Sequence, residues 1–373
     1  MKRLLFIFSI LLAVAVLPAQ AYASHGGEET KVDPKEIIFE HMGDAYGWEV
    51  PFNHHVRIPL PIIVWGESGL HCFLSSKVAD GKEYVDNGVT FKVAGKDSPY
   101  KGKVVEIIDG KEYKPWDFSI TKNVCALFIT VLLVIWAVMT VARWHKRYGH
   151  KAPRKATGFI EMIMMFVYDG VIKPTLGAKS QKFAPYLLTV FFFILIMNLM
   201  GLIVVFPGGA NLTGNIAVTL VLAICTFLVT NIFATKHYWK EMFWPDVPTW
   251  LKAPLPIMPV IEIFGALTKP AALTVRLFAN MMGGHMIVLV LTLLIFIFAA
   301  MGPVFVGATT VVSVIFSIFM LLIDVLVSFI QAFVFTMLST IFISLAQEEG
   351  HHEHKKEDDH SHVSAAQAVQ PVK

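Results

Sequence analysis

Two long apolar stretches near the C-terminus constrain the fold of this chain more than any other feature. Residues 257–301 and 304–346 contain 45 and 43 residues and are separated by only two. A helix rises 1.5 Å per residue, so each would be about 65 Å long, whereas the hydrocarbon core of a bilayer is about 30 Å thick. Either each stretch folds back on itself, or both are tilted as a hairpin of long helices. The lack of a charged or Pro/Gly-rich reversal after Gly284 or after Gly307 favours the tilted hairpin.

The composition also indicates a membrane protein. Of 373 residues, 55% are hydrophobic and 16% are charged, which is too much apolar surface for one soluble core. The net charge of +3 is spread out, without the clustering of a nucleic-acid binder. The three cysteines show no metal-ligand or redox spacing, and no phosphate-binding Gly-x-x-x-x-Gly-Lys-Ser/Thr loop occurs. We therefore predict no resident cofactor, no metal and no nucleic-acid partner.

The first 118 residues predict two segments ahead of the membrane part. Two cations, an apolar stretch over 4–17 and a small-x-small pattern before Ser24 are typical of a signal peptide over residues 1–23. An uncleaved first span is the alternative, but about 14 apolar residues are short against the roughly 20 that a span needs. Residues 24–118 alternate in short stretches between Asp-Asn-Gly and Asp-Gly-Lys turns. They predict a small β-rich periplasmic domain.

Three further apolar stretches predict the remaining spans and their orientation. The stretch 124–141 is followed by six Lys and Arg residues within 143–155, which mark the cytoplasmic side. The stretches 184–206 and 213–235 are joined by an uncharged loop, which predicts a hairpin whose loop lies outside. With the two long stretches, about five spans result. The mature N-terminus is then periplasmic and the C-terminus cytoplasmic.

Two other segments complete the predicted organisation. Residues 158–171 place apolar side chains at helical spacing beside two acids, which predicts an interfacial helix. Residues 347–373 are charged and His-rich, and we expect a solvated cytoplasmic tail, with transition-metal binding as the alternative. The fold class is therefore an all-α polytopic membrane protein. Its membrane domain covers residues 119–346 and follows the small β-rich domain.

Ionisable side chains at membrane depth lie almost entirely in the two long stretches. Glu262, Lys269, Arg276 and His285 lie in the first, and Asp324 lies in the second. Such residues are functional in most membrane proteins, and a central arginine costs about 2.5 to 3.5 kcal/mol on insertion scales. The chain supplies few acids near Arg276, so we expect its partner to come from another chain.

Helical periodicity places these residues on separate faces. At about 100° per residue, Glu262, Lys269 and Arg276 share a narrow stripe, and His285 lies on the opposite face. If both segments are regular helices, the separate polar faces indicate separate aqueous approaches.

Two amides extend these faces. Asn280 lies one turn beyond Arg276, and Gln331 lies seven residues after Asp324. The alternative to aqueous approaches is that these polar residues form interhelical hydrogen bonds in a buried bundle. That alternative accounts for Asn280 and Gln331 but poorly for Arg276.

One motif resembles a known family. Residues 273–281, Leu-Thr-Val-Arg-Leu-Phe-Ala-Asn-Met, resemble the RLF-x-N signature of the F-type ATP synthase a subunit. Segments 197–202 and 330–335 stand at family-like places, and the resemblance covers roughly residues 119–349. Residues 24–118 lie outside the common core and look like the N-terminal extension of some bacterial members.

The resemblance implies a non-catalytic, ion-translocating stator subunit of a rotary ATP synthase in the bacterial inner membrane. It implies two half-channels and an arginine that faces the carboxylates of the c-subunit ring, so that proton flow is coupled to ATP synthesis. The implied partners are the c-ring, the b-subunit peripheral stalk, the rest of the F1Fo complex and membrane lipid. The expected ion is H⁺, with Na⁺ as the alternative.

The resemblance also implies roles for six residues. Arg276 matches the family's essential arginine, whose permanent charge can hold a ring carboxylate ionised. His285 and Asp324 match a titratable pair in the half-channel open to the outside, although members differ in which helix carries the acid. Glu262 matches a position associated with the cytoplasmic exit path. Asn280 and Gln331 match polar positions that line or support the site.

A self-contained ion-coupled secondary transporter or channel is the competing function. Arg276 would then bind a substrate, and Asp324 would be the coupling site. Such folds usually show internal repeats and broken helices. The sequence shows no convincing repeat between its halves and no Gly/Pro interruption at Arg276, which favours the ATP synthase interpretation.

Overall fold

A computed structural model describes residues 43–348, apart from 51–52, 68, 80–81, 96–97, 109, 150, 154, 204–209, 244–256 and 300–302. The predicted signal peptide and the predicted tail beyond residue 348 lie outside the described residues. The chain divides into two units. Unit 1 contains the chain up to Glu161 together with Phe191–Val218 and Leu277–Ala332, and unit 2 contains Met162–Val190, Thr219–Arg276 and the chain from Phe333.

Short antiparallel strands form the N-terminal part of unit 1. They make a two-stranded sheet β1-β2, a three-stranded sheet in the order β4-β3-β9 and a four-stranded sheet in the order β5-β6-β7-β8. The bounds are β1 Gly47–Val50, β2 Asn53–Pro59, β3 Pro61–Gly66, β4 Gly69–Leu74, β5 Tyr84–Asp86, β6 Val89–Val93, β7 Val104–Ile108, β8 Lys111–Tyr113 and β9 Trp116–Asp117. The strands fall within the region for which the sequence predicts a β-rich domain.

The hairpin between β5 and β6 shows how the sequence sets this topology. Its two central residues, Asn87 and Gly88, have φ values of 51° and 85°. Asn and Gly adopt positive φ at little cost, and such turns match the twist of paired strands. The Asp-Asn-Gly sequence therefore directs β6 back along β5.

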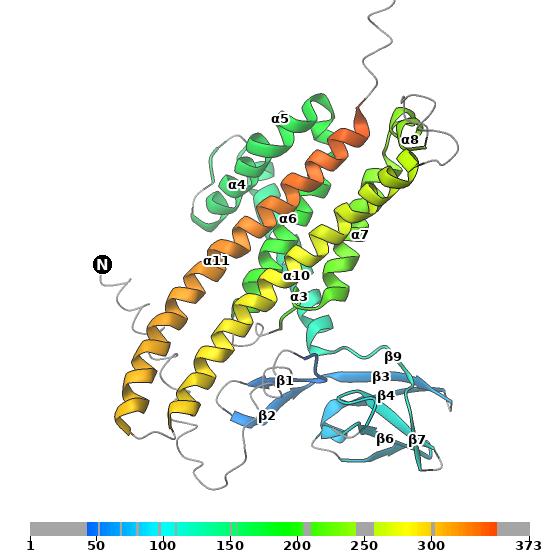
Figure 1. The fold of residues 1–373 in the computed structure, drawn as a ribbon, viewed down its shortest axis with the longest axis vertical. Coiled ribbons are helices and arrows are strands. Elements are labelled where there is room, and N and C mark those ends of the chain that lie inside the picture. The colour runs from blue at the N-terminus through cyan, green and yellow to red at the C-terminus, as the bar shows by residue number, and fades with distance from the viewer. Residues whose placement is uncertain are drawn as a thin grey trace, which may run out of the picture. The chain divides into compact units, whose positions relative to one another are not determined.

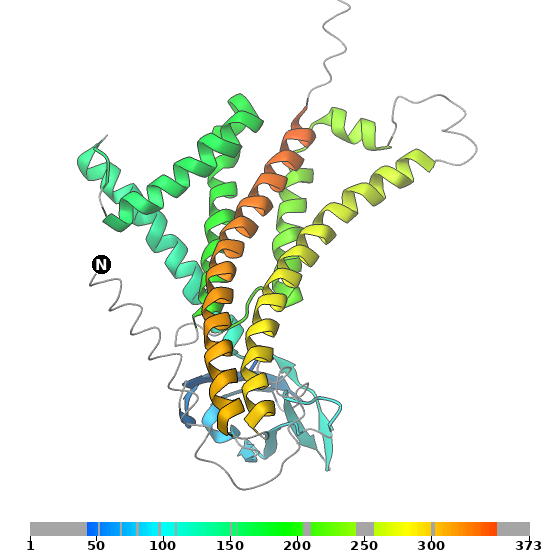
Figure 2. The ribbon, with the colours of Figure 1, turned by 60° about the vertical axis from the view of Figure 1, so that its left-hand side comes forward.

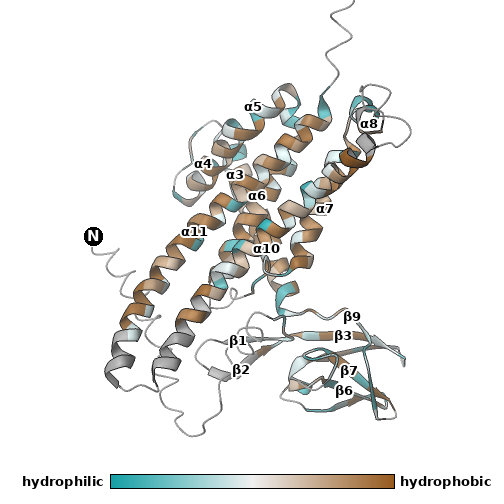
Figure 3. Cartoon of the chain, in the orientation of Figure 1, coloured by the Kyte–Doolittle hydropathy of each residue, from teal (hydrophilic) through white to brown (hydrophobic). Residues whose placement is uncertain are grey.

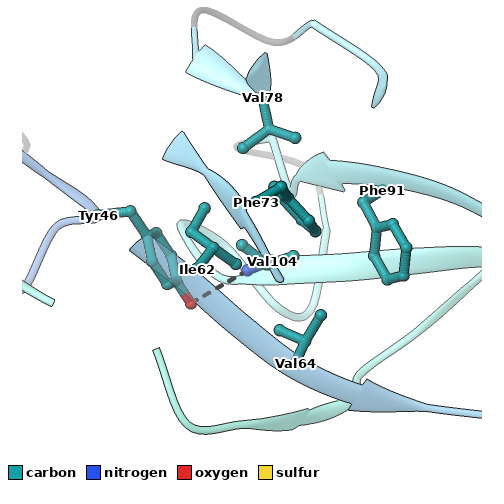
Figure 4. Packing of buried hydrophobic residues seen from close by; sticks show 7 residues of the cluster. All are labelled: Tyr46, Ile62, Val64, Phe73, Val78, Phe91 and Val104. Carbon is teal, nitrogen blue, oxygen red and sulfur yellow. Dashed lines mark hydrogen bonds between the residues drawn. The ribbon is translucent and has the colours of Figure 1, made fainter. Parts of the chain in front are cut away.

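Alternating side chains on these strands form a small core, shown in Figure 4. Ile62 and Val64 point inward from β3 and are fully buried, and Phe73, Phe91 and Val104 pack with them. Because successive strand residues point to opposite faces, the residues between them face outward. The core thus lies between the three-stranded and four-stranded sheets.

Helices of 4 to 45 residues follow the strands (Figure 1). Their bounds are α3 Lys122–Tyr148, α4 Lys155–Val167, α5 Lys173–Leu176, α6 Ser180–Leu202, α7 Ile216–Ile232, α8 Lys236–Phe243, α10 Ile257–Ala299 and α11 Pro303–Gln347. A π-helical turn over Tyr168–Ile172 and a 3₁₀ turn over Gly177–Lys179 make Lys155–Leu202 one continuous helical stretch. A further 3₁₀ turn, Ser75–Lys77, follows β4.

Three helical stretches among the described residues are long and apolar enough to cross a membrane: Lys122–Tyr148, Lys155–Leu202 and Thr309–Gln347. Ile216–Ile232 is a shorter apolar helix. In Figure 3 these helices are coloured mainly as hydrophobic, with isolated hydrophilic residues between the apolar ones. The chain is therefore a membrane protein that is mostly helical.

The first long helix begins and ends where its sequence supplies capping groups. The Thr121 hydroxyl accepts a hydrogen bond from the Val124 amide at 3.4 Å, and the Asp44 carboxylate accepts one from the Asn123 amide at 3.2 Å. Gly149, with φ of 61°, ends the helix. Acceptors at the N-terminus and a glycine after the C-terminus satisfy groups that the helix leaves unpaired.

The strand region is attached to the helices of unit 1 through Trp48. This side chain, 2% exposed, packs with Ala126 of α3, Met197 of α6 and Leu212 in the segment before α7. The Lys122 amide also donates to the Ala45 carbonyl at 2.9 Å. Residues 44–48 therefore hold the first turns of α3 by both packing and hydrogen bonds.

The last two helices are each uninterrupted (Figure 1, Figure 2). α10 contains 43 residues and α11 contains 45, so neither stretch folds back on itself. Pro270 lies inside α10, where the Thr274 hydroxyl donates to the Pro270 carbonyl at 2.9 Å. The helical bond that the proline removes is a different one, to the carbonyl of residue 266 one turn earlier, and the helix continues past it.

The helix α7 is shorter than the sequence predicts. It begins at Ile216 and ends at Ile232, inside the predicted span 213–235. Its start is delayed because Asn211 accepts a hydrogen bond from the Gly214 amide at 2.9 Å and Asn215 accepts one from the Ala217 amide at 3.0 Å. Asparagine side chains that bond nearby amides favour turns and helix starts over helix interiors.

Candidate functional site

Four of the six predicted site residues line one cavity within unit 1. Asn280 and His285 come from α10, Asp324 and Gln331 come from α11, and Asn198 of α6 joins them. The space available to the centre of a water molecule is about 10 Å³. This is close to what a single ordered water requires. The cavity is therefore small, built from three helices, and lined by polar side chains among apolar ones.

A direct hydrogen bond joins the two predicted amides. Asn280 Nδ2 donates to Gln331 Oε1 at 2.7 Å. Gln331 is 5% exposed, and its Nε2 is buried without a hydrogen-bond partner among the described residues. The Oδ1 atom of Asn198 is also buried and has no hydrogen-bond partner among the described residues. Buried amide groups normally bond to protein or ordered water, so this cavity suits a water molecule.

The Asp324 carboxylate lies against the backbone of α10 at Gly284. A Cβ atom placed on Gly284 would lie 2.7 Å from Asp324 Oδ1, closer than real Cβ contacts allow. Only glycine therefore leaves room for the carboxylate in this position. Residue 284 contacts residue 324, and residue 280 contacts residue 331. Because the numbers fall along α10 as they rise along α11, the two helices run antiparallel within unit 1.

The imidazole of His285 lies beside α6. A Cβ on Gly201 would lie 3.6 Å from His285 Nε2, which is ordinary van der Waals contact, and the Nε2 atom is buried. The same Cβ would lie 2.5 Å from the end of the Met281 side chain. Gly201 thus allows α6 to approach the face of α10 that carries His285.

Arg276 is exposed on α10. Leu273 and Leu277, three residues before and one after it, are buried at 2% and 1% exposure. Ala272 and Ala279, one turn to either side, are exposed. The arginine therefore stands on an outward face of the helix, flanked by small side chains.

Glu262, the sixth predicted residue, lies within α10, but its side chain is outside the described part of the structure.

Two known families match separate parts of the chain. The family described as "ATP synthase A chain" matches residues 124–344, which is more than half of the chain. The chain belongs to the ATP synthase A chain family. A second match covers residues 37–118 and is described as "Domain of unknown function (DUF8433)".

Individual relatives of the chain are named as the a subunit of ATP synthase. The chain is similar to "ATP synthase subunit a 2" of Chlorobaculum tepidum, with 42% identity over 258 residues, covering 66% of this chain and 69% of the relative. It is 41% identical over 243 residues to "ATP synthase subunit a" of Pelodictyon phaeoclathratiforme, covering 64% and 69%. For "ATP synthase subunit a" of Myxococcus xanthus the identity is 38% over 254 residues, covering 66% and 77%. The self-contained transporter is therefore not favoured.

This ATP synthase A chain has a second cavity with polar side chains in its lining, within unit 2. Its lining includes Thr226, Thr230 and Asn231 of α7 and Lys269 of α10. The space available to the centre of a water molecule is about 20 Å³. The Lys269 ammonium lies 5.3 Å from the centre of the Phe342 ring, a favourable cation–π distance. A cluster of hydroxyls and one cation thus lines a space between α7, α10 and α11.

Sequence reasoning did not single out Gly284, Gly201 or the threonines of α7. A glycine inside a helix pattern indicates a packing reason, and Gly284 directly precedes His285, which is the one signal that the sequence offered. The threonines carried no such signal, because Thr226 and Thr230 lie inside an apolar stretch and donate to carbonyls of their own helix. Their place at a cavity depends on which helices meet.

Proposed function

We propose that this chain is the ion-translocating stator subunit of a rotary F-type ATP synthase, with the six residues above as its ion path. Family membership over residues 124–344 supports the subunit. The observation that carries the path is the cavity that joins His285, Asp324, Asn280 and Gln331 inside otherwise apolar helices. Intramembrane ionisable groups around a polar cavity are typical of proton pathways.

Arg276 is the gate in this proposal. An exposed arginine on a membrane helix costs about 2.5 to 3.5 kcal/mol unless a partner covers it. The exposed Ala272 and Ala279 leave room for another helix to approach closely. A carboxylate on the c-ring suits both features, because a nearby guanidinium favours its ionised form. The ring carboxylate releases its proton there and reloads from the other side.

His285 and Asp324 form the relay of the half-channel open to the outside. An imidazole exchanges protons near neutral pH, and a carboxylate on the neighbouring helix can accept and return the proton. Asn280 and Gln331 orient water along this route through their hydrogen bond and their remaining polar groups. Glu262 belongs to the cytoplasmic exit path, to which we also assign the unit 2 cavity beside Lys269.

The topology in this proposal has five spans: α3, α6, α7, α10 and α11. Helices of 43 and 45 residues exceed the hydrocarbon thickness by about twofold, so α10 and α11 are strongly tilted as a hairpin. α4 lies at the interface, because Phe159, Met162 and Phe166 are exposed on it. Residues 24–118 are then periplasmic after removal of residues 1–23, and the tail from 347 is cytoplasmic.

The proposed partners follow from the same role. They are the c-ring, the b-subunit peripheral stalk and the remaining F1Fo subunits, with nucleotide chemistry in other chains. H⁺ is the ion that His285 favours, because Na⁺ binding has no use for an imidazole.

The first test is ATP synthesis driven by a proton gradient in membrane vesicles that carry Arg276→Ala. We expect coupled synthesis to be lost while the c-ring still co-purifies. Arg143→Ala, which removes an exposed cation near the end of α3, is the matched control and should keep synthesis. Normal synthesis with Arg276→Ala would refute the gate. Failure of the unmutated chain to co-purify any ring would refute the stator assignment.

A further inference from the structure

The three-stranded sheet β4-β3-β9 has an outward face made of apolar side chains. We call this the outer sheet face and define it by the outward residues of the three strands: Ile63, Trp65, Leu70, Cys72, Leu74 and Trp116. The strand register places Trp116, Trp65 and Leu70 in one cross-strand row. Residues paired directly across antiparallel strands share a face, so these three side chains lie next to one another.

The outer sheet face is open, although the opposite face of the same strands is closed. Trp116 is 76% exposed, Trp65 58% and Leu70 62%, whereas Ile62 and Val64 are 0% exposed. No member of the outer sheet face is charged. An exposed apolar cluster that includes two tryptophans is characteristic of an interaction or membrane surface.

This face continues directly into a membrane helix. After Trp116, backbone hydrogen bonds hold the chain to β3 and to the segment before β1. The Phe118 amide donates to the Ile63 carbonyl at 2.9 Å, and the Lys122 amide donates to the Ala45 carbonyl at 2.9 Å. Phe118 is itself 62% exposed. Lys122, at the start of α3, is six positions after Trp116, which is at most about 20 Å of extended chain. The face is therefore held within reach of the bilayer that α3 enters.

The distribution of charge distinguishes the two sheets. On the four-stranded sheet, Lys92 and Glu112 form an ion pair at 2.8 Å, and Lys111 is exposed. Aromatic side chains prefer the membrane–water interface, and charged ones prefer water. The domain thus has one surface suited to lipid headgroups and another suited to solvent.

We propose that the outer sheet face lies on the lipid headgroups of the leaflet where α3 begins. Trp65, Trp116 and Phe118 insert at the level of the headgroups, and the four-stranded sheet faces the aqueous phase. Residues 43–118 are then a peripheral lipid-binding domain fused to an ATP synthase A chain. The inference requires that α3 crosses the membrane, but it does not depend on the roles of Arg276, His285 or Asp324.

Cys72 is an exposed reporter within this face. A spin label is attached to Cys72 in a chain whose other cysteines are replaced, Cys125→Ala and Cys225→Ala, and the assembled complex is placed in phosphatidylethanolamine–phosphatidylglycerol vesicles. The matched control carries the label at Val85→Cys with Cys72→Ala, because Val85 is 60% exposed on β5 of the other sheet. The measurement compares collisions with lipid-dissolved oxygen and with a water-soluble nickel chelate.

We expect the Cys72 label to collide more with oxygen than with nickel, and the label at position 85 to show the reverse. Replacing both tryptophans, Trp65→Ser with Trp116→Ser, should shift the Cys72 label toward nickel while the complex still assembles. Equal access of nickel to both positions would overturn the proposal. So would protection of Cys72 that persists in lipid-free detergent, because another subunit would then cover the face.

Discussion

Gly284 leaves the space that the Asp324 carboxylate occupies. The two residues lie on different helices, and the carboxylate oxygen fills the volume where a side chain would begin. The position of the acid in the cavity is thus set by a residue with no polar side chain. A titratable group is useful in a proton path only when its neighbours keep it at hydrogen-bonding range of the next carrier.

We predict that Gly284→Ala lowers ATP-driven proton pumping severalfold without preventing assembly. The added methyl group must displace the carboxylate, and overpacking of this kind costs about 1–3 kcal/mol. The control is Gly170→Ala, since a Cβ at Gly170 meets nothing within 4 Å. Proton pumping is followed by quenching of a pH-sensitive dye in inverted vesicles. Equal pumping by both variants would contradict the role of Gly284.

A second prediction concerns a single residue among the N-terminal strands, Asp117. Its carboxylate accepts hydrogen bonds from the Tyr46 hydroxyl and from the Ser119 amide at 3.0 Å. Burial raises the pKa of Asp117, but hydrogen bonds from Ser119 and Tyr46 outweigh it and hold the pKa below its usual value. For Tyr46, burial and the bond to Asp117 both raise the pKa, so the hydroxyl keeps its proton.

A carboxyl whose pKa is lower in the folded state stabilises the fold above its unfolded pKa of about 3.9. We therefore expect the strand region to lose stability as the pH falls below about 4, through the folded pKa of Asp117. Hydrogen exchange at Val104, whose amide donates to the Tyr46 hydroxyl at 3.2 Å, reports the loss. Asp117→Asn should remove this part of the pH dependence, whereas Glu67→Gln, at an exposed turn position, should retain it. An identical pH profile for both variants would argue against the assignment.

At the scale of whole elements, Trp48 links a strand to the helices. Its indole lies in one buried cluster with residues of α3 and α6, separate from the core that contains Ile62 and Phe91. The strand region therefore has two separate cores, one internal and one shared with the membrane helices. The shared core determines whether that region is held against α3 or only tethered to it.

We expect Trp48→Ala to release the strand region from α3. Removing a buried tryptophan costs about 3–5 kcal/mol. Hydrogen exchange at the first turn of α3 should accelerate, because the Asn123 amide depends on Asp44 in the same segment. Val85→Ala, at a position 60% exposed, should leave exchange there unchanged. Unaltered protection with Trp48→Ala would show that the hydrogen bonds alone hold the segment.

The boundaries of the last two helices were predictable from the sequence to within a few residues. The predicted stretch 257–301 is the helix Ile257–Ala299, and the predicted stretch 304–346 is Pro303–Gln347. Their length and largely apolar sequence indicate helix, and the lack of a reversal signal favoured one uninterrupted helix over a stretch that folds back on itself. The continuous helical stretch from Lys155 to Leu202 was less predictable, because it includes a π-helical turn and a 3₁₀ turn that no periodicity indicates.

At the scale of the whole molecule, periodicity located the site residues but not the contacts between them. The seven-residue step from Asp324 to Gln331 predicts a shared helix face from helix geometry alone, and both residues line one cavity. The pairing of Asn280 with Gln331 depends on how α10 and α11 align across 51 residues of chain. No local pattern specifies that alignment, and the neighbourhood of Gly284 depends on it as well.

The proposed topology of five spans predicts that the two ends of the membrane part lie on opposite sides. In a chain without native cysteines, Lys111→Cys on β8 should react with a membrane-impermeant thiol reagent in cells whose outer membrane is permeabilised. Glu348→Cys, just after α11, should react only in inverted vesicles. Both positions are exposed, so the difference reports sidedness and not burial. Labelling of both from one side would require an even number of spans.

The uninterrupted course of α11 has a mechanical consequence. Asp324 and Gln331 stand seven residues apart on this helix, a rise of about 10.5 Å. A continuous helix bends sharply only when its backbone ladder is interrupted. When torque from a turning rotor loads the stator, α11 is therefore displaced as a stiff rod, and the acid and the amide keep their spacing. Elastic compliance must then come from where the rod is held, at its ends and at its contacts with neighbouring helices.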